Sequence, residues 1–292
     1  MYERAKYKEA PDRPIRQTDV GSIKYDGANY FVPIDEKGGL RFFSRRESVK
    51  GGFPERTASL PHLTDSLLPE FAGHVYNVEL IHTGHDKNSV ESHSMVSGIL
   101  NSLPPRAIAT QEALGPVRMV IHNVVNPVFG TYEQALEQMR KFERALGKPN
   151  LAFVAPTVRG PEAIAKLIDH TRAAGREGVI ITPLHEPEPA TRIKIKHKIT
   201  HNLRVASITQ LIDKTGHPKP MMGSLVCVDG LGRNVADVGT GFSRDQRIDA
   251  YLHPDNWVGK PIQVESMGLA RSKLRMPVYN GDADGEVDTL PI

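Results

Sequence analysis

The sequence predicts an α+β fold in two parts: antiparallel sheets over residues 1–198, and a small β-barrel, of about the size of an OB-fold, over residues 199–292. Periodicity alone leaves open whether the second part is a separate domain. Two observations support this prediction. Strand-like runs, tight turns and two amphipathic helices fill the chain up to about residue 198, which favours an antiparallel α+β domain. Beyond residue 200, short strands alternate with glycine-rich turns, and roughly five strands in about 90 residues suit a small barrel.

Strand-like runs begin early in the first part. Between residues 20 and 46 they are separated by the turns Asp26-Gly27 and Lys37-Gly38-Gly39. We expect strands here at Gly21–Ile23, Ala28–Pro33 and Gly39–Phe43. Further strands are expected at Val75–His82, Val117–Val125, Leu151–Ala155 and Gly178–Thr182.

Two segments of the first part have helical spacing. The segment Tyr132–Leu146 carries one apolar stripe, made of Ala135, Leu136, Met139, Phe142 and Leu146. The segment Pro161–Ala174 has a proline in its first turn and is followed by Gly175, which is typical of a helix start and stop. We therefore expect a helix over each segment.

The second part has the texture of a small all-β domain. Its clearest strands are Gly223–Asp229, Arg233–Val238 and Pro261–Ser266. Four acidic residues crowd the last eleven positions, namely Asp282, Asp284, Glu286 and Asp288. We expect this acidic end to be a solvated terminus.

Composition excludes several classes of protein. Hydrophobic residues make up 39% of the 292 residues and charged residues 24%, an ordinary globular balance. No apolar run approaches the roughly 18–20 residues that span a bilayer, and the charged N-terminus lacks the apolar core of a secretory signal. The single cysteine, Cys227, excludes an internal disulfide and fits a reducing cytoplasm. The net charge of +3 is too small to establish a nucleic-acid partner by itself.

The most informative string is Ile23-Lys24-Tyr25-Asp26-Gly27. A strand that runs into a tight Asp-Gly turn would hold Lys24 at a fixed angle. A lysine acts as a nucleophile only after losing its proton, which neighbouring cations or desolvation favour. Taken alone, the string describes an ordinary surface lysine before a hairpin turn.

Four further elements follow Lys24 in order. Phe43-Ser44-Arg45 ends a strand about 20 residues later, and Glu79 lies within an apolar strand. Glu177 comes directly before another strand. In the string Arg192-Ile193-Lys194-Ile195-Lys196, the alternation places Lys194 and Lys196 on the same face of a strand. Each element alone is equally compatible with solvated lysines and strand-edge carboxylates.

Together and in this order, the elements resemble the motif set of the covalent nucleotidyltransferases, which include ATP-dependent DNA ligases, RNA ligases and mRNA capping enzymes. Strings in the second part are similar to the OB domain of small phage and bacterial DNA ligases. These strings are Gly223–Val228, Arg233–Ser243, Gly259–Glu265 and Leu274–Val278. The resemblance covers residues from about 20 to 279, and implies a nucleotidyltransferase (adenylation, ATP-grasp-like) domain followed by an OB-fold domain.

The resemblance implies a role for each of these residues. Lys24 would be the nucleophile that carries AMP, and Lys194 and Lys196 would contact the α-phosphate. Glu79 and Glu177 would bind Mg²⁺ or Mn²⁺, for which hard carboxylate oxygens are suitable ligands.

The nucleotide would be bound by further residues of the same motifs. Ile23, Asp26 and Gly27 belong to the nucleotide site, and Arg45 would hold the ribose or the phosphate of a nick. His122 occupies the place of the aromatic residue that stacks on adenine, although an ordinary core or surface histidine is an equal alternative.

The implied function is that of an ATP-dependent DNA ligase, which seals 5′-phosphate/3′-hydroxyl nicks in duplex DNA through a lysine–AMP intermediate and adenylated DNA. Such a protein would bind ATP and nicked double-stranded DNA, act as a monomer without a membrane partner, and work in the cytoplasm of a bacterial or phage-infected cell in DNA replication, repair or recombination. The alternatives are an RNA ligase, a capping-type nucleotidyltransferase, and a degenerate DNA-binding relative without activity.

The chain departs from the ligase pattern in four places. Asn29 stands where ligases usually have arginine, and Asn77 where they have the first aspartate of a D-G-E string. His122-Asn123 replaces an aromatic-Asp pair. The basic R-x-D-K motif expected after the R-x-P string is replaced by the acidic segment Tyr279–Gly285. That basic motif normally orients the departing pyrophosphate, so its loss bears on the lysine-adenylation step.

Overall fold

The structure is a computed structural model that describes residues 6–8, 13–48, 51–82, 93–270 and 272–292. The chain divides into two compact units, Met1–Lys196 (unit 1) and His197–Ile292 (unit 2). This division falls two residues before the boundary expected from the sequence. Among the described residues, no helix is both long and apolar enough to cross a membrane.

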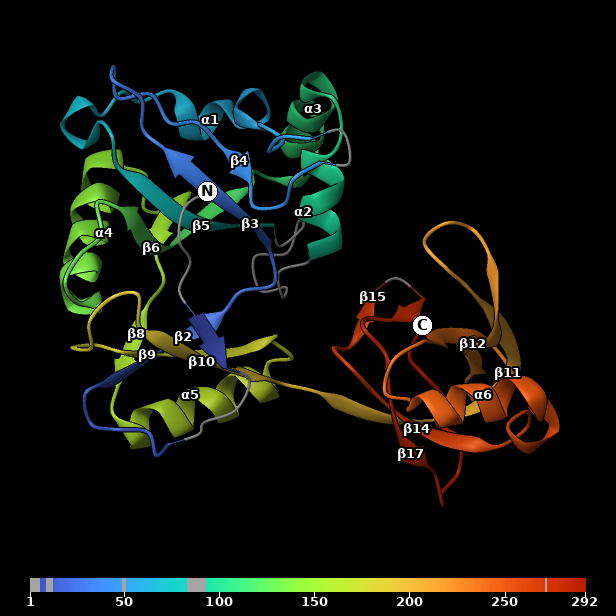
Figure 1. The fold of residues 1–292 in the computed structure, drawn as a ribbon. Helices are drawn as coiled ribbons and strands as arrows, with labels where there is room; N and C mark the ends of the chain where they lie inside the picture. Colours follow the sequence, from blue (N-terminus) through green and yellow to red (C-terminus); the bar gives the residue numbers. More distant parts are fainter. Residues whose placement is uncertain (1–5, 9–12, 49–50, 83–92, 271) are drawn as a thin grey trace. The chain divides into compact units, whose positions relative to one another are not determined.

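Unit 1 contains two five-stranded sheets (Figure 1). The first sheet has the order β1 (Lys6–Lys8), β10 (Thr191–Lys196), β9 (Gly178–Pro183), β2 (Asp19–Lys24) and β8 (Thr157–Arg159). The second has the order β4 (Phe43–Ser44), β3 (Ala28–Pro33), β5 (Val75–Ile81), β6 (Arg118–Asn126) and β7 (Ala152–Val154). Among the described residues of unit 1, β1 pairs with β10 and β6 with β7 in parallel, and the other strand pairs are antiparallel, so the expected antiparallel sheets are confirmed.

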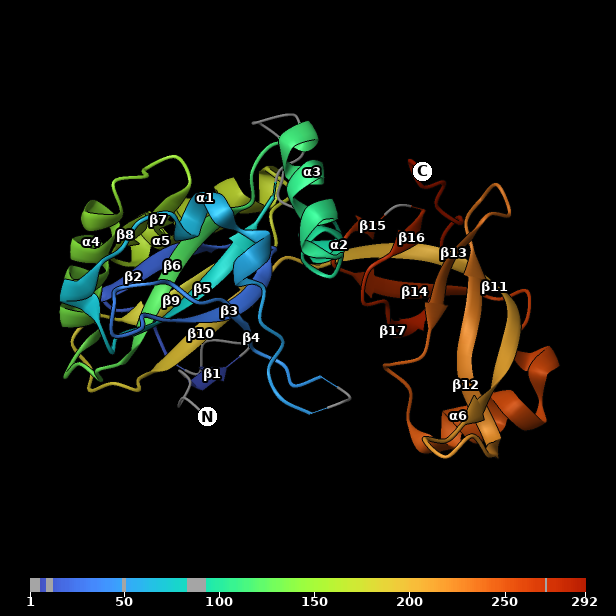
Figure 2. The same cartoon turned by 90° about the horizontal axis from the view of Figure 1, so that it is seen from above.

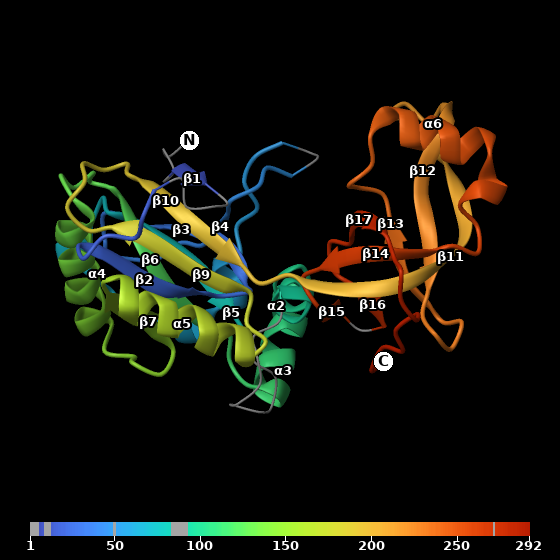
Figure 3. The same ribbon diagram turned by 90° about the horizontal axis from the view of Figure 1, so that it is seen from below.

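Helices cover each sheet of unit 1. Helix α5 (Pro161–Ala173) lies along the first sheet, where Ile164 packs with Val179, Ile181 and Ile193 (Figures 1 and 3). Helix α4 (Tyr132–Leu146) packs on the second sheet through its predicted apolar stripe. Its ends follow capping rules, because the Thr131 side chain accepts from the backbone N–H of Gln134 and Gly147 closes the C-terminus with a φ of 65°.

The remaining helices of unit 1 are short. They are α1 (Pro61–Thr64), α2 (His93–Leu100), α3 (Pro104–Leu114) and the 3₁₀ turns Thr57–Ser59 and Pro69–Phe71. The sequence did not predict α2 or α3. The expected strand Gly39–Phe43 is wrong, because Leu40 forms only an isolated bridge with Ile34 and the strand begins at Phe43.

Unit 2 is built on one antiparallel sheet (Figures 2 and 3). Its order is β13 (Asn234–Val238), β12 (Pro218–Val228), β11 (Ile199–Ile212), β14 (Pro261–Ser266) and β17 (Val278–Asp282). The sheet is accompanied by α6 (Arg244–Leu252), a 3₁₀ turn Pro254–Asn256 and the small hairpin β15 (Leu269–Ala270) and β16 (Lys273–Leu274).

Strand β11 organises this sheet. Its first half pairs with β14 and its second half with β12, and register shifts interrupt the second pairing. Such bulges bend a strand and increase its twist, which lets one sheet fold over its own core. That core contains Leu203, Val205, Cys227 and Ile262. In the described part of the chain, β13 and β17 remain the edges of the sheet.

The acidic C-terminus is only partly the solvated end expected from the sequence. Leu290 is buried in the core of unit 2. Its backbone N–H donates to the Asp229 carboxylate (3.3 Å), and Arg233 donates to its carbonyl (2.5 Å). Asp288 accepts from the backbone N–H of Asn202 (3.0 Å), so the last residues are fastened to the unit. The expectation was wrong here because it weighed the acidic residues and ignored the apolar Leu290.

Candidate active site

Lys24 is the last residue of β2 and forms a row with residues of two neighbouring strands. In the pairing register, Lys24 lies opposite Gly178 of β9, and Gly178 lies opposite Lys196 of β10. Paired residues on neighbouring strands direct their side chains to the same face of a sheet. Because Gly178 has no side chain, no side chain lies between Lys24 and Lys196 in this row, and their strands are about two strand spacings apart, or roughly 10 Å.

The same face carries the second predicted lysine. The next row joins Ser22 of β2, Ile180 of β9 and Lys194 of β10. Helix α5 covers the opposite face, which carries Val179 and Ile193. The three lysines therefore lie on the face that α5 leaves uncovered.

Arg192 belongs to this face as well, since it lies two residues before Lys194 on β10. Its side chain is nearly buried, lies 3.3 Å from the Glu188 carboxylate and is 4.7 Å from the centre of the Tyr132 ring. The sequence analysis gave Arg192 no role. The alternation Arg192-Ile193-Lys194 would have placed it on the lysine face.

The Lys24 ammonium forms an ion pair with the carboxylate of Glu177. Both side chains are largely buried, with exposed fractions of 18% and 14%. Glu177 directly precedes Gly178, and the absence of a side chain at Gly178 allows β9 and β10 to pair here. A Cβ at Gly178 would lie 1.9 Å from the carbonyl oxygen of Ile195, so only glycine lets β9 and β10 pair this closely beside Lys24.

The turn after Lys24 is held against β5 and α2. A Cβ at Gly27 would lie 2.3 Å from the carbonyl oxygen of Leu80 and 2.8 Å from Cγ of Glu79. Asp26 is buried, and its carboxylate accepts from the backbone N–H of His93, the first residue of α2 (3.3 Å). Asp26 and Gly27 thus fix the position of the turn in this structure. Neither observation concerns a nucleotide contact.

Glu79 of β5 accepts a hydrogen bond from one side-chain amide, which is itself bonded to a second amide. Asn29 Nδ2 donates to Oε2 of Glu79 (3.1 Å) and to the carbonyl oxygen of Val78 (3.2 Å). Asn77 Nδ2 in turn donates to Oδ1 of Asn29 (3.0 Å) and to the carbonyl oxygen of Tyr30 (3.1 Å). From the sequence, Asn29 and Asn77 were only departures from a pattern; it was not predicted that they contact each other or that Asn29 contacts Glu79.

Burial favours the uncharged forms of both Glu79 and His122. Burial raises the pKa of Glu79 to about 7, and the like charge of Glu177 adds to this effect, while Asn29, Lys24 and Arg45 oppose it. Burial lowers the pKa of His122 to about 3, and the charges of Arg192 and Lys24 lower it further. His122 Nε2 lies 3.9 Å from Oε2 of Glu79. His122 is therefore a neutral imidazole near pH 7.

These electrostatic effects show which predicted residues lie near one another. The charges of Lys24 and Glu177 shift the pKa of Glu79 on the second sheet, and the charge of Lys24 also lowers the pKa of His122. The backbone N–H of Arg45 donates to the carbonyl oxygen of Asn29 (3.2 Å). The site thus lies between the lysine face of the first sheet and the Glu79 region of the second.

Ile23 has a packing role in this structure. It is half-buried against a small apolar cluster formed by Tyr25, Ile81, Val120 and Ala155. It thereby joins the end of β2 to the second sheet.

The two glutamates are candidate ligands for a divalent metal ion. Among the described residues, no group of three or more His, Cys, Asp or Glu side chains could hold a metal. Glu79 and Glu177 nevertheless lie close enough for the charge of Glu177 to raise the pKa of Glu79. Mg²⁺ commonly takes only one or two protein carboxylates and completes its shell with water and substrate phosphates, so this donor pair fits such an ion.

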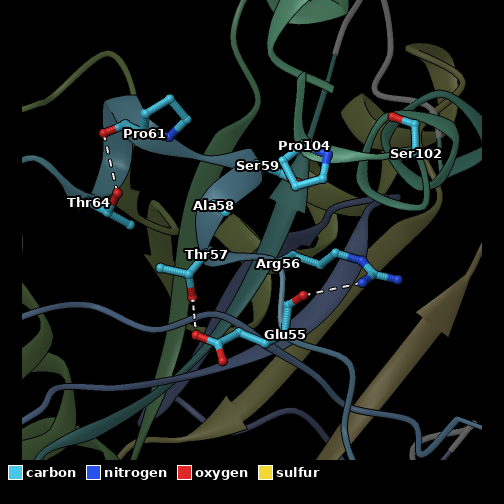
Figure 4. Close-up of a pocket in the computed structure, with 9 residues that line it drawn as sticks. All are labelled: Glu55, Arg56, Thr57, Ala58, Ser59, Pro61, Thr64, Ser102 and Pro104. Carbon is cyan, nitrogen blue, oxygen red and sulfur yellow. Dashed lines mark hydrogen bonds between the residues drawn. The ribbon is translucent and has the colours of Figure 1, made fainter. Parts of the chain in front are cut away.

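A surface pocket lies elsewhere in unit 1 (Figure 4). It is lined by Glu55, Arg56, Thr57, Ala58, Ser59, Pro61, Thr64, Ser102 and Pro104. None of these residues was predicted to bind a nucleotide. Thr57 donates to the Glu55 carboxylate (2.7 Å), and Arg56 donates to the Glu55 carbonyl (3.2 Å) and to Asn101 (3.4 Å). We therefore place the candidate site at Lys24 and not in this pocket.

Comparison with known proteins gives structural relatives only. No protein-family profile and no curated sequence matches the chain. A solved structure from a study of Lig E DNA ligases and DNA binding matches with a TM-score of 0.70 at 16% identity, covering 97% of this chain and 100% of the other. The structure named Pmar-Lig_PreS3 matches with a TM-score of 0.64 at 14% identity, covering 90% and 63%. A mycobacterial DNA ligase D complexed with ATP gives 0.50 at 19% identity, covering 98% and 96%. Over nearly its whole length, this chain therefore has the fold of the ATP-dependent DNA ligases.

Proposed function

We propose that this chain is an ATP-dependent DNA ligase that seals nicks in duplex DNA, with Lys24 as its nucleophile. The observation that carries the proposal is the row Lys24–Gly178–Lys196, in which two lysines share one sheet face on either side of a residue without a side chain. A triphosphate placed there would meet the nucleophile and its charge-stabilising partner together. The fold shared with the DNA ligase structures supports the choice of reaction.

In the first step, the Lys24 amine attacks the α-phosphorus of ATP. A phosphorus–nitrogen bond forms, the bond to the pyrophosphate oxygen breaks, and a proton leaves the lysine nitrogen. Lys194 and Lys196 stabilise the negative charge on the phosphate oxygens, because such transfers depend mainly on positioning and electrostatics. Lys24 must also leave its ion pair with Glu177 before it attacks.

Glu79 and Glu177 would hold Mg²⁺ or Mn²⁺ in this site. The ion would neutralise charge on the triphosphate. His122, neutral and largely buried, would stack on the adenine, and Arg45 would hold the ribose or the nick phosphate. Ile23, Asp26 and Gly27 would complete the nucleotide site, mainly by fixing the turn that follows Lys24.

The later steps require DNA. AMP passes from Lys24 to the 5′-phosphate of a nick, and the 3′-hydroxyl then attacks that phosphate and releases AMP. In this proposal unit 1 is the adenylation domain and unit 2 is an OB-fold domain that contacts backbone phosphates. Binding by a monomer should then depend little on DNA sequence and should weaken as salt rises.

The first experiment is intact-protein mass spectrometry with ATP and Mg²⁺. The proposal expects a mass gain of one AMP that maps to Lys24 and is absent in Lys24→Ala. A nick-sealing assay with DNA and RNA substrates, and with GTP in place of ATP, separates a DNA ligase from an RNA ligase or a capping-type enzyme. A wild-type protein that never gains AMP and never seals a nick would falsify the proposal.

A second candidate is a DNA-binding relative that has lost the reaction. The sequence favours it at one point, because no lysine or arginine follows Arg275 where ligases have a basic motif. The structure uses this segment for packing, with the Tyr279 ring stacked on Phe242 at 4.5 Å. A pre-adenylated nick decides between the candidates: a ligase impaired only in lysine adenylation seals it, whereas an inactive relative binds it unchanged.

A further inference from the structure

Two of the departures from the ligase pattern are in direct contact. Asn29 lies on β3 and Asn77 on β5, 48 positions apart in the sequence. The register places Asn29 opposite Glu79, and Glu79 lies two residues after Asn77 on β5. The three side chains therefore share one face of the second sheet. In the sequence, Asn29 and Asn77 are two separate departures from the ligase pattern, but in the structure their side chains form one hydrogen-bonded group.

The hydrogen bonds run through this group in one direction. The amide of Asn77 bonds the backbone carbonyl of Tyr30, which can only accept, so the donating atom must be Nδ2 of Asn77. The same Nδ2 also donates to Oδ1 of Asn29. Asn29 likewise donates to the backbone carbonyl of Val78, so its Nδ2 is the atom that reaches Glu79. Both ends of the relay are thus fixed by backbone groups.

This relay can hold the Glu79 carboxylate in one orientation. Glu79 and Lys24 are largely buried, with exposed fractions of 15% and 18%, so little water is available to replace a lost donor. Oε2 receives the Asn29 bond at 3.1 Å, which directs one oxygen toward β3. Groups that hold a metal-binding carboxylate in this way commonly change metal affinity or activity by about 10–100-fold when they are removed.

Resting on the function proposed above, we propose that Asn29 and Asn77 are coupled positioning residues that orient Glu79 for metal and nucleotide binding through a neutral amide relay. Neutrality matters because Asn29 contacts the largely buried carboxyl group of Glu79, and Asn77 contacts Asn29. An arginine at position 29 alone would add a cation beside Glu79. An aspartate at position 77 alone could not donate to Asn29 or to the Tyr30 carbonyl, so both of these hydrogen bonds would be lost. Together, the arginine and aspartate could pair with each other.

The test is a double-mutant cycle of Asn29→Arg, Asn77→Asp and the double variant, with Asn29→Ala to remove the donor without adding charge. Each single variant should raise the Mg²⁺ concentration for half-maximal Lys24 adenylation by about tenfold. The double variant should return to within about threefold of wild type. Asn150→Asp is the matched control, because Asn150 is exposed before β7 and outside the relay, so the same added charge should leave the Mg²⁺ concentration for half-maximal adenylation unchanged.

Two measurements independent of turnover accompany the cycle. Mn²⁺ binding in the presence of a non-hydrolysable ATP analogue, followed by electron paramagnetic resonance, should show the same pattern of loss and recovery. Urea unfolding reports whether each variant is folded. Recovery in metal binding and adenylation supports the relay; coupling in unfolding alone, with wild-type metal dependence in every variant, overturns it.

The outcome also separates this inference from the proposed function. If wild type never forms the lysine–AMP bond, the ligase proposal fails, and Mn²⁺ binding alone judges the relay. Coupled loss and recovery of Mn²⁺ binding would then support the relay as a positioning device. Independent effects of the two substitutions would overturn it.

Discussion

Gly27 sets how closely the turn after Lys24 approaches Glu79. An added methyl group would lie 2.3 Å from the Leu80 carbonyl oxygen, which is backbone and cannot move aside without disturbing β5. We predict that Gly27→Ala costs about 1–3 kcal/mol in the free energy of unfolding and strongly slows Lys24 adenylation. Urea unfolding and adenylation kinetics measure the two effects.

Gly98 supplies the control for this substitution. It lies within α2, and a Cβ there would meet no atom within 4 Å. Gly98→Ala should be neutral or stabilising by up to about 1 kcal/mol, because alanine is the better helix former. Equal behaviour of the two variants would show that the close approach at Gly27 has no consequence.

Glu79 should make stability depend on pH in a defined direction. Burial raises its pKa from 4.5 to about 7, so the folded protein holds a proton that the unfolded chain has lost in this window. Stability therefore falls as pH rises from about 5 to 8, by roughly 3 kcal/mol from this group. In Glu79→Gln, this part of the decrease in stability with rising pH should vanish.

The comparison must be made between variants, because His122 acts in the opposite direction. Its pKa is lowered to about 3, so its contribution to stability is present above pH 6.5 and is lost as pH falls. Chemical unfolding of wild type and Glu79→Gln at each pH cancels the His122 contribution. Parallel curves for the two proteins would contradict a raised pKa at Glu79.

Sequence reasoning at this scale identified residue types more readily than partners. Lys24, Glu79 and Glu177 were singled out because each lies in a strand or directly before one, in a definite order along the chain. The contact between Asn29 and Asn77 was not predictable, because it depends on the register of β3 against β5, which no local pattern specifies.

At the scale of elements, β10 shows what alternation determines. Ile193 packs under α5, so Lys194 and Lys196 must lie on the opposite face with Lys24. We predict that Lys196→Ala slows Lys24 adenylation by about 100-fold or more, as expected when one charge-stabilising group is lost. Rapid-quench measurement of AMP transfer to the protein tests this.

Lys198 is the matched control, only two residues further along the chain. It lies beyond β10, and its ammonium pairs with Glu265 of unit 2 at 2.7 Å. Both side chains of this pair are partly exposed, so Lys198→Ala should have little effect on stability or on adenylation. A similar loss of adenylation rate in Lys196→Ala and Lys198→Ala would show that the net charge of the protein matters, and not the position of Lys196.

Elements with strong local signals were predicted, and those without were missed. Helix α4 was predicted with its bounds because its apolar stripe and glycine end act together. Helix α6 was missed although Ser243 and Gln246 form a capping box at its start. Strand β11 was missed because only part of its length is buried, so its alternation fades after Val205.

At the scale of the molecule, all the residues predicted to bind ATP belong to unit 1. Unit 2 ends in an acidic segment whose last residues pack on its own core, and no basic residue follows Arg275. The acidic segment Tyr279–Gly285 stands where the resemblance to ligases implies a basic motif. Under the proposed function, we therefore expect unit 2 to contribute to the DNA-dependent steps and little to the charging of Lys24.

Leu290 tests this division of labour. It is 4% exposed in the core of unit 2, and its backbone is bound by Asp229 and Arg233. We predict that Leu290→Ala lowers the unfolding free energy by about 2–5 kcal/mol and reduces nick sealing while Lys24 adenylation stays near wild type. Ile292→Ala, at an exposed position, is the control and should change neither. If Lys24 adenylation falls in parallel with nick sealing in Leu290→Ala, the prediction is contradicted. Because the substitution lies in the core of unit 2, such a result would mean that unit 2 takes part in the adenylation of Lys24 despite its missing motif.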